Sequence, residues 1–286
     1  MESTSVVKST LYVVATPIGN LADFTVRAEQ VLKQVDVICC EDTRHSARLM
    51  EHIGCKTQLI SLHEHNEREK SQYIVERLQS GESIALVSDA GTPLISDPGY
   101  VLVNSVVDAG LKVVPIPGVS AVITALSVAG LPTDRWFFEG FLPSKGSARL
   151  KRMQQLAAAT ETLVFYESSH RIEASLVDVM EAFGGDRPIA VARELTKTFE
   201  TVLRGRAESV LSQLQDDKNQ KKGEFVVMVG GAQAVEQGDE DERAYMLANE
   251  LKALMPPKKA AALVAKLFGG NKKVYYDYLV GLNTSG

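Results

Sequence analysis

Short apolar runs that carry no charge recur about every 25 residues through the first 116 residues of the chain. A run such as Ile84–Val87 is typical of a strand that is buried on both faces, as the strands of parallel sheets are. Stretches with helical character separate the runs, 44–52, 66–79 and 97–109 among them. This alternation predicts a mostly parallel sheet with helices on its faces. The predicted strands are 11–15, 35–40, 58–62, 84–87 and 112–116.

The polar turn after the fourth run is the first candidate for a ligand site. It reads Ser88-Asp89-Ala90-Gly91-Thr92-Pro93 and continues to Asp97-Pro98-Gly99. Gly91 allows a tight turn and a close approach to a ligand, and Pro93 ends strand pairing. Ligands of open α/β sheets bind beyond the carboxyl ends of the strands, where Ser88, Asp89 and Thr92 are expected. The alternative is a turn that its own Asp side chain stabilises.

Other predicted strand ends also carry polar or small residues. Thr16–Asn20 follows the first strand, and the charged segment Glu41–His45 follows the second. Pro117–Ala121 places small residues and free N–H groups at a helix start, which suits a ligand loop or a simple turn between domains.

The second half predicts a different sheet. Some of its apolar runs follow one another without an obvious helix, which favours a mixed sheet. A polar stretch then leads to amphipathic helical segments around a Gly269-Gly270 turn, and the residues from Leu251 onward carry six lysines and one acid. A basic helical module of this kind is typical of nucleic-acid binding. The alternative is a pair of helices that only pack against each other, with lysines that face solvent and bind nothing. The second-half strands are expected at 135–142, 163–166, 189–192, 199–203 and 225–229. The expected organisation is 10–117 for an N-terminal α/β domain, 118–231 for a C-terminal α/β domain, 232–242 for a linker and 243–286 for a basic helical extension.

Composition excludes several classes of protein. The net charge of −5 argues against a chain that coats nucleic acid along its whole length, and three cysteines are too few for a disulfide framework, which favours the cytoplasm. The uncharged stretch 113–133 is interrupted by Pro115 and Pro117 and is too short to cross a membrane as a helix. No Gly-x-Gly, Walker A loop or zinc-protease motif occurs. His63 and His65 lack a third ligand at a supporting spacing, so no metal is expected.

Seven short motifs at strand ends and loops stand out, namely Thr16–Leu21, Glu41–Arg44, Ser88–Pro93, Pro117–Ala121, Glu139–Phe141, Phe165–Ser168 and Ala192–Lys197. Together they resemble the bacterial small-subunit ribosomal RNA methyltransferase I family, over about residues 11–230, and the basic tail resembles that family as well. The resemblance implies a two-domain tetrapyrrole-methylase-like (class III methyltransferase) α/β fold, with S-adenosylmethionine bound between the domains. It also implies methylation of the ribose 2′-hydroxyl of a cytidine in the decoding region of 16S rRNA. By position, the residues expected to line the cofactor are Pro17, Ser88, Asp89, Thr92, Ser120, Ala121, Tyr166 and Ala192.

Methyl transfer to a ribose oxygen requires alignment of the oxygen, the methyl group and the sulfur, and the hydroxyl must lose its proton. The candidates for the base are charged residues at predicted strand ends, namely Glu41, Asp42, His45, Glu167 and Glu194. The candidates for holding RNA phosphates are Arg44, Arg171, Arg193 and Lys197 beside the cleft, and Lys258, Lys259, Lys272 and Lys273 in the tail. The charged clusters are equally compatible with ion pairs between domains.

The sequence therefore predicts an S-adenosylmethionine-dependent RNA ribose methyltransferase that binds 16S rRNA or the small ribosomal subunit. Two alternatives stay open, a tetrapyrrole carbon methyltransferase of the same fold and a non-catalytic ribosome-binding module. The Lys-rich tail favours RNA, because a small porphyrinoid gives it no role. Proteins of the resembled fold usually form dimers, so a homodimer is expected. No interaction with a membrane is expected.

Overall fold

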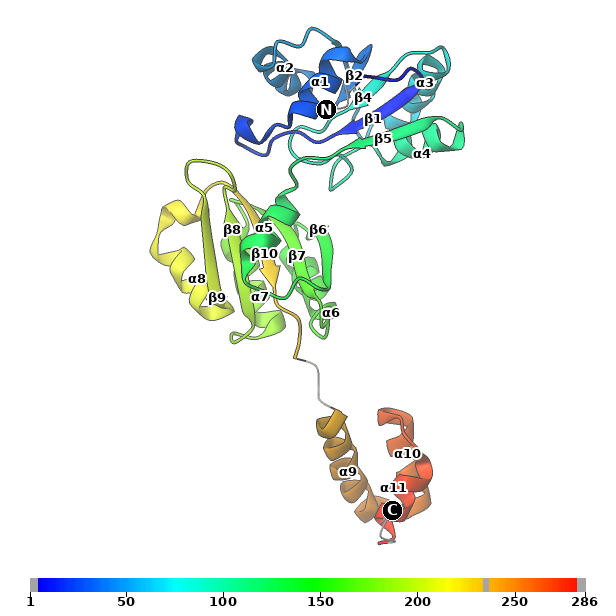
Figure 1. Ribbon diagram of the computed structural model, residues 1–286. Coiled ribbons are helices and arrows are strands. Elements are labelled where there is room, and N and C mark those ends of the chain that lie inside the picture. The colour runs from blue at the N-terminus through cyan, green and yellow to red at the C-terminus, as the bar shows by residue number, and fades with distance from the viewer. Residues whose placement is uncertain (1–4, 234–236, 282–286) are drawn as a thin grey trace. The chain divides into compact units, whose positions relative to one another are not determined.

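Five parallel strands form the first sheet, in the order β3-β2-β4-β1-β5 (Figure 1). The computed structural model describes residues 5–233 and 237–281, the latter with side chains from 242 onward. The strands are β1 (Thr10–Val14), β2 (Val37–Cys40), β3 (Gln58–Ser61), β4 (Ile84–Leu86) and β5 (Lys112–Ile116). The helices are α1 (Val26–Gln34), α2 (Thr43–His52), α3 (Glu67–Gln79) and α4 (Tyr100–Asp108). The predicted parallel sheet is confirmed.

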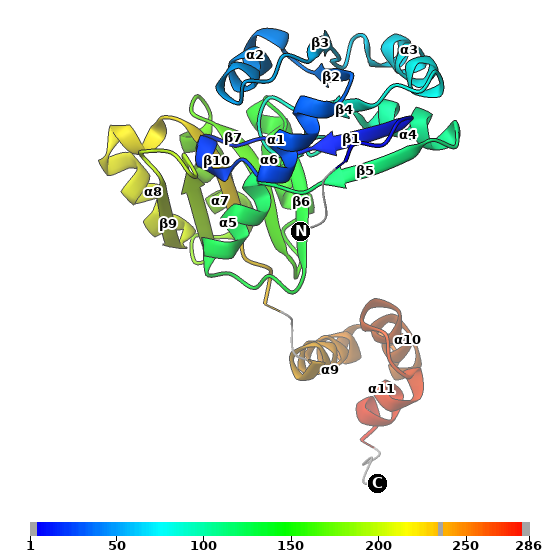
Figure 2. The same ribbon diagram turned by 45° about the horizontal axis from the view of Figure 1, so that its top comes forward.

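Both faces of this sheet are covered, which explains why its strands lack charge. One core contains Cys40 with side chains of α1 and α2, and the other contains Cys39 with side chains of α3 and α4. Neighbouring residues of a strand point to opposite faces, so each strand needs apolar side chains at consecutive positions. In Figure 2, α2 and α3 lie on opposite sides of β2 and β3.

The second sheet is mixed, as predicted, with the order β6-β7-β10-β8-β9. Only β6 and β7 pair in parallel, and the other three pairs are antiparallel. Its core lies on two faces, because α5 covers one of them while α6, α7 and α8 cover the other. The strands are β6 (Trp136–Phe141), β7 (Thr162–Ser168), β8 (Pro188–Arg193), β9 (Thr201–Arg206) and β10 (Glu224–Val229). The helices are α5 (Ala121–Ala129), α6 (Gly146–Gln155), α7 (Ile172–Phe183) and α8 (Ala207–Asp216).

Helices α7 and α8 were not predicted, although the sequence contains their signal. In α8 the buried residues are Ala207, Val210, Leu211 and Leu214, which have the helical spacing i, i+3, i+4, i+7. Strand β9 begins at Thr201, two residues later than the predicted strand 199–203.

The chain divides into two compact units, Met1–Ala232 and Gln233–Gly286. The first unit contains both sheets. The second contains α9 (Gln237–Leu254), α10 (Pro257–Phe268) and α11 (Lys272–Leu279), packed around buried side chains such as Ala248, Val264 and Tyr275. The predicted linker 232–242 is too long, because α9 begins at Gln237. Polarity alone did not mark the boundary, since Gln and Glu are good helix formers.

Among residues 5–233 and 237–281, no helix is long and apolar enough to cross a membrane.

Candidate functional site

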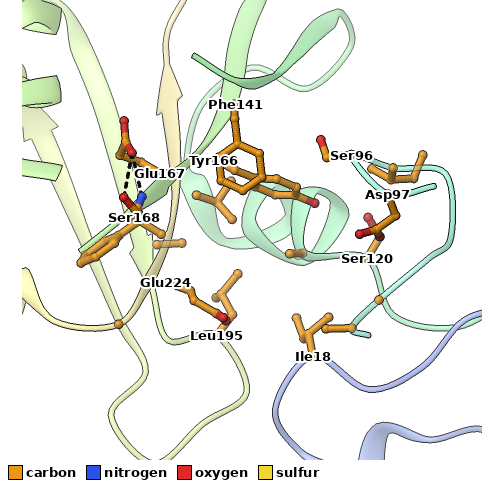
Figure 3. Close-up of a pocket in the computed structure, with 18 of the residues that line it drawn as sticks. Ile18, Ser96, Asp97, Ser120, Phe141, Tyr166, Glu167, Ser168, Leu195 and Glu224 are labelled. Carbon is orange, nitrogen blue, oxygen red and sulfur yellow. Dashed lines mark hydrogen bonds between the residues drawn. The ribbon is translucent and has the colours of Figure 1, made fainter. Parts of the chain in front are cut away.

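A cavity of about 480 Å³ lies between the strand ends of the first sheet and the second sheet of the first unit (Figure 3). Loops that follow β1, β4 and β5 form one side, and β6, β7, β8 and β10 contribute the other. Its size is ordinary for a small-molecule site. The lining residues include Ile18, Asp89, Thr92, Asp97, Ser120, Ala121, Phe141, Tyr166, Ala192, Leu195 and Val226.

The loop after β4 is fixed by hydrogen bonds that its polar residues make. Gly91 and Thr16 exchange two backbone hydrogen bonds, of 2.8 and 3.0 Å, so the loops after β1 and β4 are joined. Gly91 has φ of 84°, a conformation that favours glycine. The Ser88 hydroxyl donates to the carbonyl of Gly91 at 3.3 Å. The Thr92 hydroxyl donates to the carbonyl of Val119 at 2.9 Å, which ties this loop to the segment before α5.

Six of the eight residues predicted to line the cofactor do line the cavity, namely Asp89, Thr92, Ser120, Ala121, Tyr166 and Ala192. The other two, Pro17 and Ser88, do not line it. Ile18 contributes to the wall in place of Pro17, and Ser88 is buried beneath the loop whose shape it fixes. The loops that carry these motifs reach the cavity, but which side chain of a loop faces it depends on the backbone path of that loop.

Tyr166 forms the middle of the site, between the Glu167 side and the Asp97 side (Figure 3). Phe138 and Phe141 hold its ring, with centroids 5.0 and 5.4 Å away. Burial, and to a smaller extent the carboxylate of Asp97, raises the pKa of Tyr166 to about 12, which the backbone N–H of Val122 opposes. The phenol therefore remains neutral at physiological pH.

Asp97 is a site residue that sequence reasoning missed. It lines the cavity, and burial followed by the like charges of Glu41 and Asp89 raises its pKa to about 6. Glu41 does not line the cavity, but burial and Asp89 raise its pKa too. The available signal was an acid directly before Pro98-Gly99 at a helix start, in the same loop as Asp89.

Glu167 lies at the opposite wall, but its carboxylate is occupied. One oxygen accepts from the Ser168 N–H at 2.7 Å and from Arg171 Nε at 2.9 Å, and the other accepts from the Ser175 hydroxyl. The side chain is fully buried. This geometry does not fit the predicted base, because the carboxylate is fully buried and both of its oxygens already accept hydrogen bonds. Because Arg171 forms an ion pair with Glu167, its guanidinium is not free to bind a phosphate in the way that the sequence predicted.

Asp42 and His45 follow the end of β2, and neither lines the cavity. Asp42 caps α2, and the hydrogen bond from the Arg44 side chain holds the pKa of its carboxyl well below the usual range. The Asp42 backbone N–H donates to Asp89 at 3.2 Å, which orients that carboxylate. His45 is exposed on α2 and does not line the cavity.

The other predicted phosphate ligands of the cleft have structural partners. Arg193 is buried and donates to the carbonyls of Lys222 and Phe199, at 2.6 and 2.8 Å. This placement does not fit a phosphate ligand, and it explains why a positive charge is tolerated at the end of a buried strand. Lys197 pairs with Glu194 and Glu224 at 2.9 Å each, which also occupies Glu194. Arg44 is largely exposed despite its pair with Asp42.

The lysines of the second unit lie at two helix starts. Lys258 and Lys259 begin α10, and Lys272 and Lys273 begin α11 after a turn in which both Gly269 and Gly270 have positive φ. All four are exposed, and none forms an ion pair with another residue of the described chain. They are therefore available to an anionic partner.

The residues present fit S-adenosylmethionine. The walls are apolar at Ile18, Leu195 and Val226, which suits an adenosine, and the carboxylates of Asp89 and Asp97 suit a cation. Among the described residues, no group of three or more His, Cys, Asp or Glu side chains is arranged to hold a metal ion.

Comparisons with known proteins agree on the family. The tetrapyrrole (corrin/porphyrin) methylases match residues 10–211, and the RsmI C-terminal HTH domain matches residues 237–283. Ribosomal RNA small subunit methyltransferase I of Xylella fastidiosa (strain Temecula1) is 52% identical over 269 residues, which cover 93% of this chain and 97% of that one. The protein of the same name from Escherichia coli O157:H7 is 49% identical over 268 residues, covering 94% and 93%.

Solved structures show the same fold at low identity. Uroporphyrin-III-C-methyltransferase from Thermus thermophilus has a TM-score of 0.55 with 19% identity, covering 78% of this chain and 94% of that one. Cobalt precorrin-4 methyltransferase has a TM-score of 0.56 with 16% identity, covering 78% and 95%.

Proposed function

This chain belongs to the ribosomal RNA small subunit methyltransferase I family, within the tetrapyrrole methylases, and on that basis we propose that it methylates a ribose hydroxyl of 16S ribosomal RNA with S-adenosylmethionine as the donor. The proposed acceptor is the 2′-hydroxyl of a cytidine in the decoding region. The observation that carries the proposal is the cavity between the two sheets, which combines an apolar wall with carboxylates.

S-adenosylmethionine supplies a methyl group on a positively charged sulfur. The residues of the chain hold and orient the reactants, because alignment contributes much of the acceleration of such a displacement. Ala121, Ala192 and Ser120 are small, so they leave room for the cofactor, and the ring of Tyr166 restricts it on one side. Asp89 is oriented by the Asp42 N–H and lines the cavity, where its carboxylate is available to a cation.

The second unit provides the contact with RNA. Free lysines at the starts of α10 and α11 suit phosphates, which contribute most of the affinity that is independent of sequence. A tetrapyrrole substrate would leave these lysines without a role. The match of this unit to a helix-turn-helix domain of the same family supports the RNA assignment.

Replacing Lys258, Lys259, Lys272 and Lys273 together by alanine is expected to weaken RNA binding and flatten its salt dependence. Each lost phosphate contact lowers the slope of log K against log salt concentration by roughly 0.7 to 0.9, so the slope falls by about 3 if all four bind. Filter binding or anisotropy with a fragment of 16S rRNA, repeated over a series of salt concentrations, measures both quantities.

A matched control removes the same charge from the first unit, at the exposed lysines Lys56, Lys112, Lys151 and Lys218. Its salt slope is expected to change much less. Equal slopes for the two quadruple variants would show that total charge, rather than the second unit, governs binding.

The proposed reaction is tested by mass spectrometry of nucleosides from 16S rRNA of cells with and without the protein. Loss of one 2′-O-methylated cytidine, restored by the wild-type gene, is the expected result. If cells without the protein kept their ribose methylation but lacked a methyl group on a base, the proposed acceptor would be overturned. If calorimetry showed that the protein does not bind S-adenosylmethionine, the result would support the alternative of a non-catalytic ribosome-binding module.

The chain is proposed to act as a homodimer in the cytoplasm. The resembled fold usually pairs, and the three buried free cysteines suit a reducing compartment. Sedimentation equilibrium of the full chain tests the dimer, and a mass equal to one chain at all concentrations would overturn it.

A further inference from the structure

Phe199 is a large apolar residue that the first unit leaves uncovered, with an exposed fraction of 69%. It lies in the rim loop, residues 193–200, which runs from the last residue of β8 to the residue before β9. Leu195 of this loop lines the cavity close to Glu224, the first residue of β10 (Figure 3). Phe199 therefore belongs to a loop at the edge of the cavity, although it does not line the cavity itself.

Buried and paired groups fix the backbone around Phe199. A single exposed apolar side chain is ordinary on a protein surface, but such a residue does not usually have a loop built to hold it. The Phe199 carbonyl accepts from Arg193 Nη1 at 2.8 Å and from the Thr201 hydroxyl at 3.2 Å. The Thr196 N–H donates to the Glu200 carboxylate at 2.6 Å. The rim loop therefore presents its aromatic ring from a defined backbone position.

The rim loop also has an unfavourable backbone conformation. Glu194 and Thr196 have φ of 49° and 67°, in the left-handed region that side chains other than glycine rarely adopt. Thr196 is β-branched, which makes this conformation still less favourable, and its buried hydroxyl oxygen has no hydrogen-bond partner among the described residues. Strain that the surroundings enforce is typical of loops that contact ligands.

Arg193 joins Phe199 to an exposed lysine. The buried guanidinium of Arg193 donates through Nε to the carbonyl of Lys222 at 2.6 Å and through Nη1 to the carbonyl of Phe199. A charged group in the interior is costly unless hydrogen bonds satisfy it, so this bridge holds the two exposed residues close together at both of its ends. The Lys222 side chain is exposed and donates to Asn219 Oδ1 at 3.3 Å.

The acids of this edge of the cavity already have partners. Glu194 and Glu224 both pair with Lys197 at 2.9 Å, and the Glu200 carboxylate accepts the backbone N–H mentioned above. Lys222 forms no ion pair with any residue of the described chain. Its charge is therefore available to an anion beside the Phe199 ring.

We propose that Phe199 and Lys222 form an RNA contact in the first unit, in which an unpaired base stacks on the Phe199 ring and Lys222 binds an adjacent phosphate. This inference rests on the proposed function. Aromatic rings that stack on bases, beside cations that bind phosphates, are the usual means of binding a single strand. A nucleotide that enters a cavity must leave its stack, and a ring at the cavity edge replaces part of the stacking that the strand loses.

A base with its phosphate fits this place better than a protein segment does. The exposed apolar area is that of one aromatic side chain, and a free lysine borders it. A protein partner usually covers a wider apolar patch from which lysine is depleted. The lysines of the second unit bind phosphates of any sequence, whereas this contact selects a strand whose bases are unpaired.

The first test compares Phe199→Ala with Phe199→Trp in the full-length protein, assayed with small ribosomal subunits and radiolabelled S-adenosylmethionine. Loss of one stacked base lowers affinity roughly 5- to 150-fold, so kcat/KM for the RNA substrate is expected to fall by that factor in Phe199→Ala. Phe199→Trp retains an aromatic face and is expected to keep the wild-type value. The dissociation constant for S-adenosylmethionine, measured by calorimetry, is expected to stay unchanged in both variants, because Phe199 does not line the cavity.

Tyr73→Ala is the matched control for the loss of an exposed aromatic ring. Tyr73 lies in the middle of α3, away from the rim loop in sequence, and is exposed. It is expected to keep the wild-type kcat/KM. Lys222→Ala tests the phosphate contact, and the slope of log K against log salt concentration for a single-stranded fragment of 16S rRNA is expected to fall by about 0.7. Lys56→Ala, at another exposed lysine of the first unit, is expected to leave the slope unchanged.

A spectroscopic test reports on the ring itself and decides the question even if Phe199→Ala does not fold. The chain has one tryptophan, Trp136, so Phe199→Trp combined with Trp136→Phe leaves a single tryptophan in the rim loop. Its fluorescence is expected to be quenched by the single-stranded fragment of 16S rRNA. An abasic oligoribonucleotide of the same length has the phosphates but no bases to stack, so it is expected to cause no quenching.

Each outcome decides between the contact and its alternatives. A wild-type kcat/KM for Phe199→Ala, or equal quenching by the abasic oligoribonucleotide, would overturn the stacking contact and leave the proposed function intact. If Phe199→Ala kept its RNA kinetics but sedimented as a smaller species than the wild type, the ring would contact a second copy of this chain, and the proposal would be wrong. A wild-type protein that leaves ribose unmethylated would overturn the proposed function, whereas quenching by the rRNA fragment alone would still support the stacking contact.

Discussion

Ala121→Phe is expected to weaken binding of S-adenosylmethionine by roughly two orders of magnitude while the first unit remains folded. Ala121 is the first residue of α5 and is partly buried, and its side chain lines the cavity. A phenyl ring there would occupy space that the cofactor needs, and forcing both into a packed site costs about 3 kcal/mol. That cost corresponds to roughly a 100-fold weaker dissociation constant, which calorimetry measures directly.

The control for this substitution lies on the same helix. Ile123 is exposed on the outer face of α5, so Ile123→Phe adds an aromatic ring without entering the cavity. It is expected to bind the cofactor as the wild type does. If Ala121→Phe also bound normally, the cofactor would have to lie elsewhere, and the assignment of this cavity would be wrong.

Glu67→Ala is expected to lower the free energy of unfolding of the first unit by about 3 kcal/mol. Glu67 is buried at the start of α3, and one of its carboxylate oxygens accepts three backbone N–H groups of the α4 start. These donors are Gly99 and Val101 at 2.9 Å and Leu102 at 3.2 Å. Alanine leaves them without an acceptor, and the favourable charge at a helix N-terminus is lost as well.

Thermal unfolding should then occur about 9 °C lower, given the size of the unit. Hydrogen exchange at Gly99, Val101 and Leu102 should accelerate more than exchange in the second sheet. Glu67→Gln retains an oxygen acceptor and is expected to lose less stability. Glu69→Ala, at an exposed position two residues along α3, is the control and should be close to wild type. Equal effects of the Glu67 and Glu69 substitutions would contradict a capping role.

Much of the fold follows from local patterns, because apolar runs and helical spacing reflect burial on one or both sides of an element. The parallel first sheet and the mixed second sheet were both predictable for this reason. Helices α7 and α8, which were not predicted, contain ordinary apolar spacing, so their signal is present in the sequence. The start of α9 at Gln237 is different, since the residues there are compatible with either a linker or a helix.

The candidate site was predictable at the level of loops and much less so at the level of side chains. A glycine turn after a buried strand indicates a ligand loop, and the family resemblance implied eight cofactor-lining residues, six of which line the cavity. The roles of charged residues did not follow, because their partners are distant in sequence. Arg193 bonds to the carbonyl of Lys222, and Glu67 binds a helix start 32 residues later.

The sequence by itself determined that strands alternate with helices, that polar loops follow the strands, and that the C-terminal helices are basic. These features depend on residue type and spacing, which act locally. Only the tertiary structure decided that Asp97 shares a cavity with Tyr166 while Glu167 and Arg193 are occupied. Whether a charged group is free or paired depends on which distant groups the packed sheets bring within hydrogen-bonding distance, and no local pattern encodes that distance.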